Sequence, residues 1–232
     1  MNRPYTFINV AMTADGKIDT FERKGSAISS KRDKERVDEL RAAADGILVG
    51  GKTLLEERPR LTVKSEALRE GRVQRGLAPN PIKVGVATSV ENADSLIGSD
   101  FIKTGSARVV IFTTKRTSKD QLEKLRNSGV EIFVHSEPLV NLTLMVQTLK
   151  KIGVDHLMVE GGGTMNFELM RLGLVDELMI YLAPMIFGGA NAPTLADGLG
   201  LTRSNAIELK LQNVEPHEDG GILLRYKFIS SP

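Results

Sequence analysis

The sequence predicts an α/β fold with a mainly parallel central sheet flanked by helices and a C-terminal antiparallel hairpin. Three observations lead to this class. Short apolar runs rich in β-branched residues recur along the chain, and segments with a helical pattern lie between them. In the second-last run, apolar residues alternate with polar ones, as in a strand with one exposed face. A polar, glycine-containing reversal then joins this run to the last one, which is typical of a hairpin.

The predicted strands are the apolar runs themselves. In chain order they cover residues 5–12, 46–50, 81–88, 107–112, 130–134, 156–160, 177–184, 206–216 and 220–228. Ile207, Leu209 and Leu211 supply the alternation in the eighth run, and residues 215–221 form the reversal before the ninth. The long apolar run around 177–184 could form either a central strand or a subunit interface.

Four helices are predicted from their end signals and their apolar spacing. Ser30 can cap the helix of residues 29–45, which has Asp33 three residues later. The helices of residues 118–129, 139–153 and 164–173 each end in a glycine, where a left-handed C-terminal cap is expected. Residues 65–80 are the most polar stretch, and we expect them to form a loop-like insert that could act as a flap.

Composition limits the possible functions. The chain has 232 residues, of which 41% are hydrophobic and 26% are charged, with a net charge of +2 and no cysteine. This balance favours no nucleic acid or membrane partner, and the lack of cysteine excludes disulfides and thiolate metal sites. No apolar run approaches the length of a membrane span, and the start has no signal-peptide pattern. We expect a single domain over residues 1–232 that is soluble and cytoplasmic.

The most informative motif is a glycine triplet. Glu160 ends a predicted strand and is followed by Gly161, Gly162, Gly163 and then Thr164 at a predicted helix start. Glycines allow positive φ angles and close approach of another molecule to the main chain. The free N–H groups and dipole of a helix start attract anions. A tight turn is the alternative, but three glycines before a helix favour contact with the phosphates of a nucleotide.

A second glycine turn follows the strand of residues 46–50. Gly50 and Gly51 precede Thr53 at a predicted helix start, and Glu57 lies one turn later on the same face. Thr53 could be a simple helix cap, but its pairing with Glu57 beside two glycines favours a nucleotide contact.

Other candidates lie nearby in sequence. Asn9 and Ala11 project to the same side of the first strand, and Ala11 is small enough for a flat ring to lie against the backbone. Asp15 and the next glycine fit a turn and a site equally well. Arg41 and Lys64 could together hold a substrate phosphate, although each could also be an ordinary solvated charge.

Several common sites are excluded by the sequence. The triplet matches neither the Walker loop nor the first-crossover fingerprint of dinucleotide-binding folds. The three histidines, His135, His156 and His217, lack metal-ligand spacing, so we expect no metal site. A nucleophile elbow is also missing. We interpret the basic turn of residues 113–120 as a solvated loop.

Taken together, four segments resemble a known family. They are "MTADGKI", "LRAAADGILVGGKTLLEERPRLTV", "VEGGGTMNFELMRLGLVDEL" and "APMIFGG". This order is similar to the reductases of riboflavin biosynthesis, and most of all to the stand-alone archaeal type that acts on 2,5-diamino-6-ribosylamino-4(3H)-pyrimidinone 5′-phosphate. The same family forms the C-terminal half of the bifunctional bacterial deaminase/reductase. The resemblance covers almost the whole chain.

The resemblance implies a dihydrofolate-reductase-like fold, a homodimer and an NADPH-dependent reduction of the ribosylamino sugar to a ribitylamino product. Ala11 would touch the nicotinamide, residues 87–89 would line the adenosine side, and residues 161–164 would hold the cofactor phosphates. The full set of implied cofactor contacts is Ala11, Thr53, Glu57, Ala87, Thr88, Ser89, Gly161, Gly162, Gly163 and Thr164. The pyrimidine and its ribose phosphate would contact Asn9, Arg41, Leu61, Lys64 and Glu160. No general acid can be named.

Two departures from the family pattern leave the cofactor open between NADPH and NADH. Glu57-Arg58-Pro59 stands where the family more often has Asp-Asp-Pro, and Ala87-Thr88 stands where it often has Asp-Ser. A longer carboxylate shifts the reach of residue 57, and the missing aspartate weakens contacts to the adenosine ribose.

Alternative functions also remain. The substrate could be the 5-amino-6-(5-phosphoribosylamino)uracil that arises when deamination comes first, because the C2 substituent cannot be deduced from sequence. Another pyrimidine or pteridine reductase of the same fold is the nearest rival; the lack of Trp and the presence of Arg41 and Lys64 favour a phosphorylated sugar over folate. A nucleotide-sensing protein without turnover would not need a second pocket.

Overall fold

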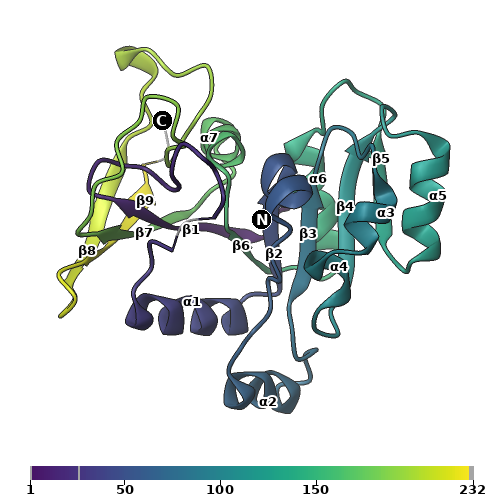
Figure 1. The fold of residues 1–232 in the computed structure, drawn as a ribbon, viewed down its shortest axis with the longest axis horizontal. Coiled ribbons are helices and arrows are strands. Elements are labelled where there is room, and N and C mark those ends of the chain that lie inside the picture. Colours follow the sequence, from purple (N-terminus) through teal and green to yellow (C-terminus); the bar gives the residue numbers. More distant parts are fainter. Residues whose placement is uncertain (1, 26, 230–232) are drawn as a thin grey trace. The chain divides into compact units, whose positions relative to one another are not determined.

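The computed structural model describes residues 2–25 and 27–229, and the chain divides into two compact units. Unit 1 is residues 37–158 together with the residues before Tyr5, and unit 2 is residues 5–36 with the chain from Val159 onward. Figure 1 labels the elements of both. Because the predicted single domain over 1–232 is not tested by this division, it stays a prediction.

Unit 1 is built on strands in the order β5-β4-β3-β2-β6. The pairs β2–β3, β3–β4 and β4–β5 are all parallel. Strands β2, β3 and β4 are almost continuously buried, as expected of a sheet with both faces covered, whereas the edge strand β5 is partly exposed. The strand bounds are β2 (Gly46–Gly50), β3 (Ile82–Val86), β4 (Val109–Thr114), β5 (Glu131–His135) and β6 (His156–Val159).

The helices of unit 1 connect these strands. Helices α3 and α5 pack together, and α5 also packs on β5 (Figure 1). Gly129 and Gly153, just after α5 and α6, have the predicted positive φ angles. The bounds are η1 (Thr53–Glu57), α2 (Glu66–Gln74), α3 (Ala93–Ile97), α4 (Asp100–Lys103), α5 (Lys119–Asn127) and α6 (Leu142–Lys151). Helix α1 (Lys31–Ala43) begins in unit 2 and ends in unit 1.

Unit 2 has strands in the order β1-β7-β9-β8. The β1–β7 pair is parallel, whereas β7–β9 and β8–β9 are antiparallel, which confirms the predicted C-terminal hairpin. Strand β7 lies between two partners and is almost fully buried, so residues 177–183 form a central strand. The bounds are β1 (Tyr5–Thr13), α7 (Gly163–Arg171), β7 (Glu177–Ala183), η2 (Arg203–Asn205), β8 (Leu209–Pro216) and β9 (Ile222–Phe228).

The sequence-based elements agree with this structure in most places. Each of the nine predicted strands is present, with bounds that differ by a few residues at most. The N–H of Asp33 donates to the Ser30 hydroxyl at 3.2 Å, as predicted for the cap of α1. Gly173 after α7 also has a positive φ.

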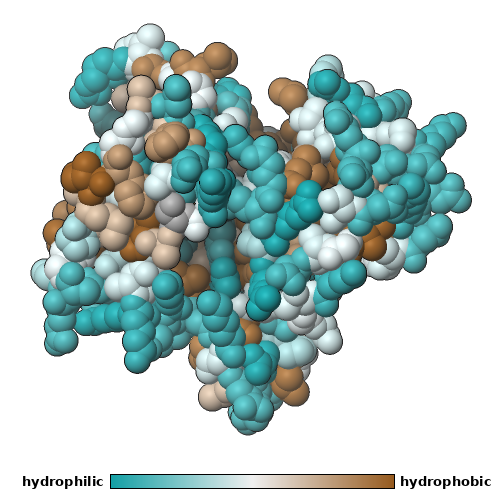
Figure 2. Space-filling model, in the orientation of Figure 1, coloured by the Kyte–Doolittle hydropathy of each residue, from teal (hydrophilic) through white to brown (hydrophobic). Residues whose placement is uncertain are grey.

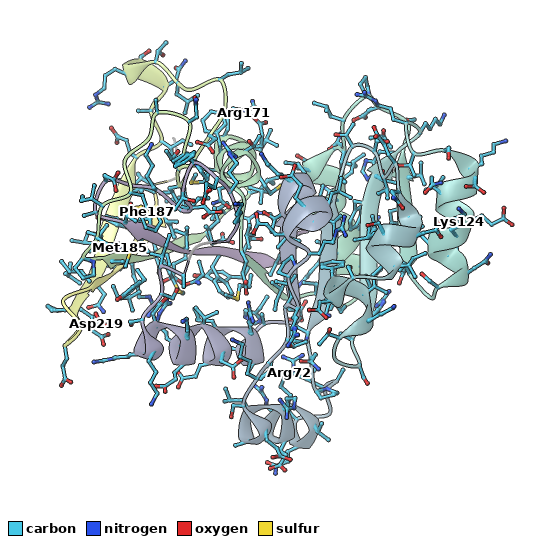
Figure 3. The ribbon with its side chains drawn as sticks, viewed as in Figure 1. Arg72, Lys124, Arg171, Met185, Phe187 and Asp219 are labelled. Carbon is cyan, nitrogen blue, oxygen red and sulfur yellow. The ribbon has the colours of Figure 1, made fainter. Side chains whose placement is uncertain are left out.

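One element prediction is wrong. Residues 65–80 are not a loop-like insert but contain helix α2, capped by the Ser65 hydroxyl. Arg72, labelled in Figure 3, anchors this helix: the residue is only 2% exposed. Its guanidinium donates to the carbonyls of Ala42, Ala44 and Ala78. Two of these carbonyls lie at or just beyond the C-terminal end of α1, where a cation is favourable. A charged side chain from a polar stretch of sequence is therefore buried and holds the helix in place.

Among residues 2–25 and 27–229, no helix combines the length and the apolar character that crossing a membrane requires.

Candidate active site

In unit 1, the loops that follow neighbouring parallel strands meet at one edge of the sheet, where open α/β sheets bind ligands. The turn after β2 presses against the end of β3: a Cβ added at Gly51 would lie 3.3 Å from Val86 O and 3.5 Å from the Ala87 Cα. Leu54 packs over Gly85, where an added Cβ would lie 2.7 Å from its side chain. The segment that carries Thr53 and Glu57 and the segment of residues 87–89, both predicted to contact the cofactor, are thus adjacent in unit 1.

Thr53 and Glu57 are linked directly. They start and end the single π-helical turn η1, and the Thr53 hydroxyl donates to Glu57 Oε1 at 3.1 Å. Thr53 is therefore not a plain helix cap. The Arg58 N–H closes the turn on Thr53 O, and Arg58 itself adopts a left-handed φ of 52°. Thr53 is buried and Glu57 is exposed, so the pair presents its carboxylate outward.

The segment of residues 87–89 is fixed to the loop after β4. Thr88 O accepts a hydrogen bond from the Thr114 hydroxyl at 2.8 Å and from the Thr114 N–H at 3.3 Å. The Ser89 hydroxyl donates to Arg116 O at 3.3 Å. Ala87 is buried, whereas Thr88 and Ser89 are partly exposed. The basic turn, interpreted from sequence as a solvated loop, therefore adjoins a predicted cofactor segment.

Two of the predicted substrate residues of unit 1, Leu61 and Lys64, lie in one short segment, and the third, Arg41, contacts that segment. The Arg41 guanidinium donates to Thr62 O at 3.1 Å, and Asp38 accepts the Lys64 N–H at 2.6 Å. The Lys64 side chain is exposed. Leu61 has a left-handed φ of 47° and a side chain that is 1% exposed, so its side chain packs into the core. At least part of Arg41 thus serves to hold the segment that carries Leu61 and Lys64.

In unit 2, the glycine triplet precedes α7, and its members differ in role. Gly161 has φ of 107° and open space where a Cβ would stand. Gly162 has φ of −72° and ψ of 178°, an extended conformation, and the Gly161–Gly162 peptide is cis. A Cβ on Gly163 would lie 2.5 Å from Thr194 O and 2.6 Å from Asp197 Oδ2. The triplet is therefore an open turn on one side and a packing contact on the other.

The start of α7 has no side-chain cap, so its first N–H groups are not covered by the side chain of the preceding residue. Thr164 is exposed in its first turn, and Glu160 is partly exposed just before the triplet. The uncapped N–H groups and the helix dipole suit an anionic group. Asn166, buried one turn later, donates from Nδ2 to Leu195 O at 2.9 Å and ties α7 to the segment that contacts Gly163.

Ala11 and Asn9 lie on β1, opposite Tyr181 and Met179 of β7. Ala11 packs against the cluster of Ile28, Tyr181 and Ala183, together with Met185 and Phe187 (Figure 3). Asn9 is 8% exposed and accepts a hydrogen bond from Arg36. Both residues keep the same side of the strand, as the alternation predicted.

Asp15, which fitted a turn and a site equally well, joins two parts of unit 2. Its carboxylate accepts hydrogen bonds from the Thr13 hydroxyl and from the N–H groups of Phe187 and Gly188. These bonds, that from Thr13 foremost, lower the pKa of Asp15. Gly16 then takes a positive φ of 80°. Asp15 thus holds the "IFGG" segment to the end of β1.

Three residues that local sequence patterns did not identify as part of the site belong to its framework. Arg36 contacts Asn9, Asp33 pairs with Arg36, and Asp197 lies against Gly163. The spacing of Asp33 and Arg36, three residues apart on α1, was visible as a helical pair. Their relation to Asn9, 27 residues away from Arg36, was not. In the described part of the chain, no group of three or more His, Asp or Glu side chains is arranged to hold a metal ion.

Comparison with known proteins then places the chain. Residues 4–223 match the model of the RibD C-terminal domain. The chain belongs to this family. It is 38% identical over 206 residues to the 2,5-diamino-6-ribosylamino-4(3H)-pyrimidinone 5′-phosphate reductase of Archaeoglobus fulgidus, covering 89% of this chain and 92% of that one. The proteins of the same name from Methanothermobacter thermautotrophicus and Aquifex aeolicus are 37% and 34% identical, each over 92% of its own length.

Solved structures agree on the fold. A pyrimidine reductase-like protein from Corynebacterium diphtheriae superimposes with a TM-score of 0.79 at 23% identity, over 99% of this chain and 94% of that one. This similarity confirms the predicted fold class. The family membership likewise confirms the predicted resemblance and the predicted enzyme class, an oxidoreductase.

Proposed function

We propose that this reductase uses NADPH to reduce the ribosylamino sugar of 2,5-diamino-6-ribosylamino-4(3H)-pyrimidinone 5′-phosphate to the ribitylamino product, in riboflavin biosynthesis. The observation that carries the proposal is the similarity, over about nine-tenths of the chain, to three proteins with this named activity. Opening of the sugar gives a C1′=N imine; a hydride added at C1′ and a proton added at nitrogen complete the reduction.

The residues present fit a nicotinamide cofactor. The open, positive-φ Gly161 and the uncapped start of α7 suit its phosphates, and Thr164 lies at the same helix start. Thr53, Glu57 and residues 87–89 form a second set of contacts in unit 1, and Ala11 leaves room for a flat ring in unit 2. When bound, NADPH supplies the hydride for C1′.

The chain's own groups bind and orient the pyrimidine phosphate. Arg41 and Lys64 supply positive charge for its phosphate, and the Asp38 and Thr62 contacts keep their segment in place. Asn9 and Glu160 supply polar contacts for the heterocycle and the sugar. Such positioning lowers the barrier by removing the need to bring the reactants together from solution.

The test of the proposed function is NADPH oxidation followed at 340 nm with the 2,5-diamino compound, and with the 2-oxo pyrimidine in parallel. We expect steady oxidation that depends on the 2,5-diamino compound. Faster turnover of the 2-oxo compound would transfer the activity to the deaminated substrate. Absence of oxidation with either, while NADPH still raises the melting temperature, would leave only the cofactor part of the proposal.

The preference for NADPH over NADH is supported by the basic turn after β4. Lys115 and Arg116 are exposed, and no side-chain hydrogen bond or ion pair is found for either within the described residues. The turn is joined to Ser89, on the predicted adenosine side. NADPH differs from NADH by a phosphate on the adenosine ribose, which two adjacent cations would attract.

Replacing both Lys115 and Arg116 by Ala should therefore raise KM for NADPH about tenfold, about 1.4 kcal/mol, and leave KM for NADH unchanged. Lys151→Ala, an exposed charge at the end of α6, is the matched control and should change neither. Equal losses with both cofactors would contradict a contact with the additional phosphate.

We also propose a homodimer. Strand β8 is exposed along most of its length, and Leu211 and Val214 remain about half exposed. Figure 2 shows apolar residues gathered over the region of β8 and β9. Unpaired strand edges with apolar side chains favour association. Sedimentation that finds only monomer at micromolar concentration would contradict the dimer.

The remaining proposals concern organisation and place. We propose a single folding domain over residues 1–232, so that unfolding should give one transition by fluorescence and circular dichroism; two separate transitions would contradict it.

We propose a cytoplasmic location, which suits a chain without cysteine. Cell fractionation that recovers the enzyme outside the cytoplasm would contradict this.

A further inference from the structure

Unit 2 contains a chain of three linked polar side chains, Asn9, Arg36 and Asp33, of which the proposed reaction uses only Asn9. Asn9 of β1 is 8% exposed, Asp33 of α1 is fully buried, and the Arg36 side chain is 15% exposed. Buried polar groups destabilise a fold unless they are hydrogen-bonded, so each contact here is informative.

Arg36 decides which way the Asn9 amide faces. Arg36 Nη2 lies 2.7 Å from Asn9 Oδ1. A guanidinium carries only donors, so the group opposite it must be an acceptor. The Asn9 amide therefore turns its oxygen toward Arg36, and its Nδ2 donors face away from the guanidinium. No hydrogen bond of Asn9 Nδ2 to another described residue is found.

Asp33 fixes Arg36 in turn. Asp33 Oδ1 accepts from Arg36 Nε at 3.0 Å and from Nη2 at 2.7 Å, and Nη1 lies 4.0 Å from the Met179 sulfur. With its planar donor group held at two points, the guanidinium cannot rotate away from Asn9. Asp33 Oδ2 is buried and has no hydrogen-bond partner among residues 2–25 and 27–229. A buried carboxylate oxygen without a hydrogen-bond partner lowers the stability of the fold. Such local losses of stability are expected at functional sites, where side chains must be held in one position.

We infer that Asp33 and Arg36 are positioning residues that lock the Asn9 amide so that Nδ2 donates to a hydrogen-bond acceptor on the pyrimidine. The acceptor class is a ring carbonyl oxygen, such as that at C4 of a 4(3H)-pyrimidinone. This inference rests on the proposed function, which gives Asn9 its place beside the pyrimidine. It adds the direction of the hydrogen bond: the enzyme donates and the heterocycle accepts.

Asn9→Asp is the decisive variant because it keeps the shape of the side chain. The carboxylate still accepts from Arg36, so the fold should persist, but it has no donor for the substrate. We expect KM for the pyrimidine to rise at least tenfold, with KM for NADPH within twofold of wild type. Asn141→Asp, which places the same charge at the cap of α6, should leave KM for the pyrimidine unchanged.

The positioning role of the other two residues has its own test. Asp33→Asn keeps the size of the side chain but removes the charge that holds Arg36, and it should raise KM for the pyrimidine about fivefold while kcat stays within twofold. Arg36→Lys supplies one donor in place of a planar pair and should raise the same KM. A role in stability alone would change the melting temperature of these variants but not KM.

The outcomes separate the inference from the function. Wild type that never oxidises NADPH with a pyrimidine phosphate would overturn the proposed function and the inference with it. Wild-type activity combined with an unchanged pyrimidine KM in Asn9→Asp would overturn the inference alone. If Asp33→Asn proves too unstable to assay, Asn9→Asp still decides whether a donor at residue 9 is required.

Discussion

The two units build their turns and bury their charges in different ways. In unit 1, Gly51 presses against the neighbouring strand of the same sheet, and the buried Lys83 of β3 donates to the carbonyls of Phe101 and Thr104. In unit 2, Gly163 meets a segment 31 residues later, and buried Asp33 has a cationic partner. Unit 1 thus depends on neighbours within a regular sheet, and unit 2 on contacts between irregular segments.

The largest expected effect contrasts the two glycine turns. In Gly163→Ala, the new Cβ would lie 2.5 Å from a backbone oxygen, so the Thr194–Asp197 segment must move. We expect a loss of about 2–3 kcal/mol in the free energy of unfolding. Gly51→Ala, with its closest contact at 3.3 Å, should cost less than about 1 kcal/mol. Urea unfolding of both variants measures the difference, and equal losses would contradict the contrast.

The contrast also explains what the sequence could predict. Strands such as Gly46–Gly50 and Val109–Thr114 are local apolar runs in a buried sheet, so their residues identify them directly. Helix ends at Gly129 and Gly153 were also predictable, because a left-handed cap is a local requirement.

The remaining features depend on distant contacts. The helix in residues 65–80 was missed because what anchors it is the burial of Arg72 on carbonyls about 30 residues earlier. The sequence associated Asp33 only with the cap of its helix and did not single out Arg36, because only the packing of α1 on β1 and β7 brings these residues to Asn9. Local periodicity carries no information about which distant segment meets a side chain.

The second prediction concerns the buried amine of Lys83 in unit 1. Burial lowers the pKa of Lys83 to about 8. Between that value and the ordinary pKa of about 10.4, the unfolded chain binds more protons than the folded one, so the free energy of unfolding rises with pH. Relative to Lys83→Met, wild type should gain about 2 kcal/mol between pH 8 and pH 10.

Urea unfolding of both proteins at pH 8, 9 and 10 measures this difference. Measurements stop at pH 10 because burial, with help from Glu177, raises the pKa of Tyr5 in unit 2 to about 12. Above pH 10 the folded state retains the Tyr5 proton that the unfolded chain loses, so the free energy of unfolding falls as the pH rises. Parallel curves for wild type and Lys83→Met would show that the buried amine keeps an ordinary pKa.

The smallest effect addresses the function of the glycine triplet. Gly161 is unsuited to this test because its positive φ strains any side chain, and Gly163 is unsuited because its surroundings are filled. Gly162 has φ of −72° and ψ of 178°, which other residues adopt readily. Gly162→Val should therefore keep the fold while its side chain obstructs the open turn, and NADPH affinity should fall at least tenfold, about 1.4 kcal/mol.

The matched control for Gly162→Val is Gly71→Val on α2, where an added Cβ meets nothing within 4 Å. It lies outside the predicted cofactor segments and should leave NADPH affinity unchanged, as measured by fluorescence titration. Because a valine in mid-helix has its own small cost in stability, melting temperatures of both variants show whether folding accounts for any loss. Unchanged affinity in Gly162→Val would mean that the triplet of unit 2 is needed for its turn and its packing, like Gly51 in unit 1, and not for a phosphate.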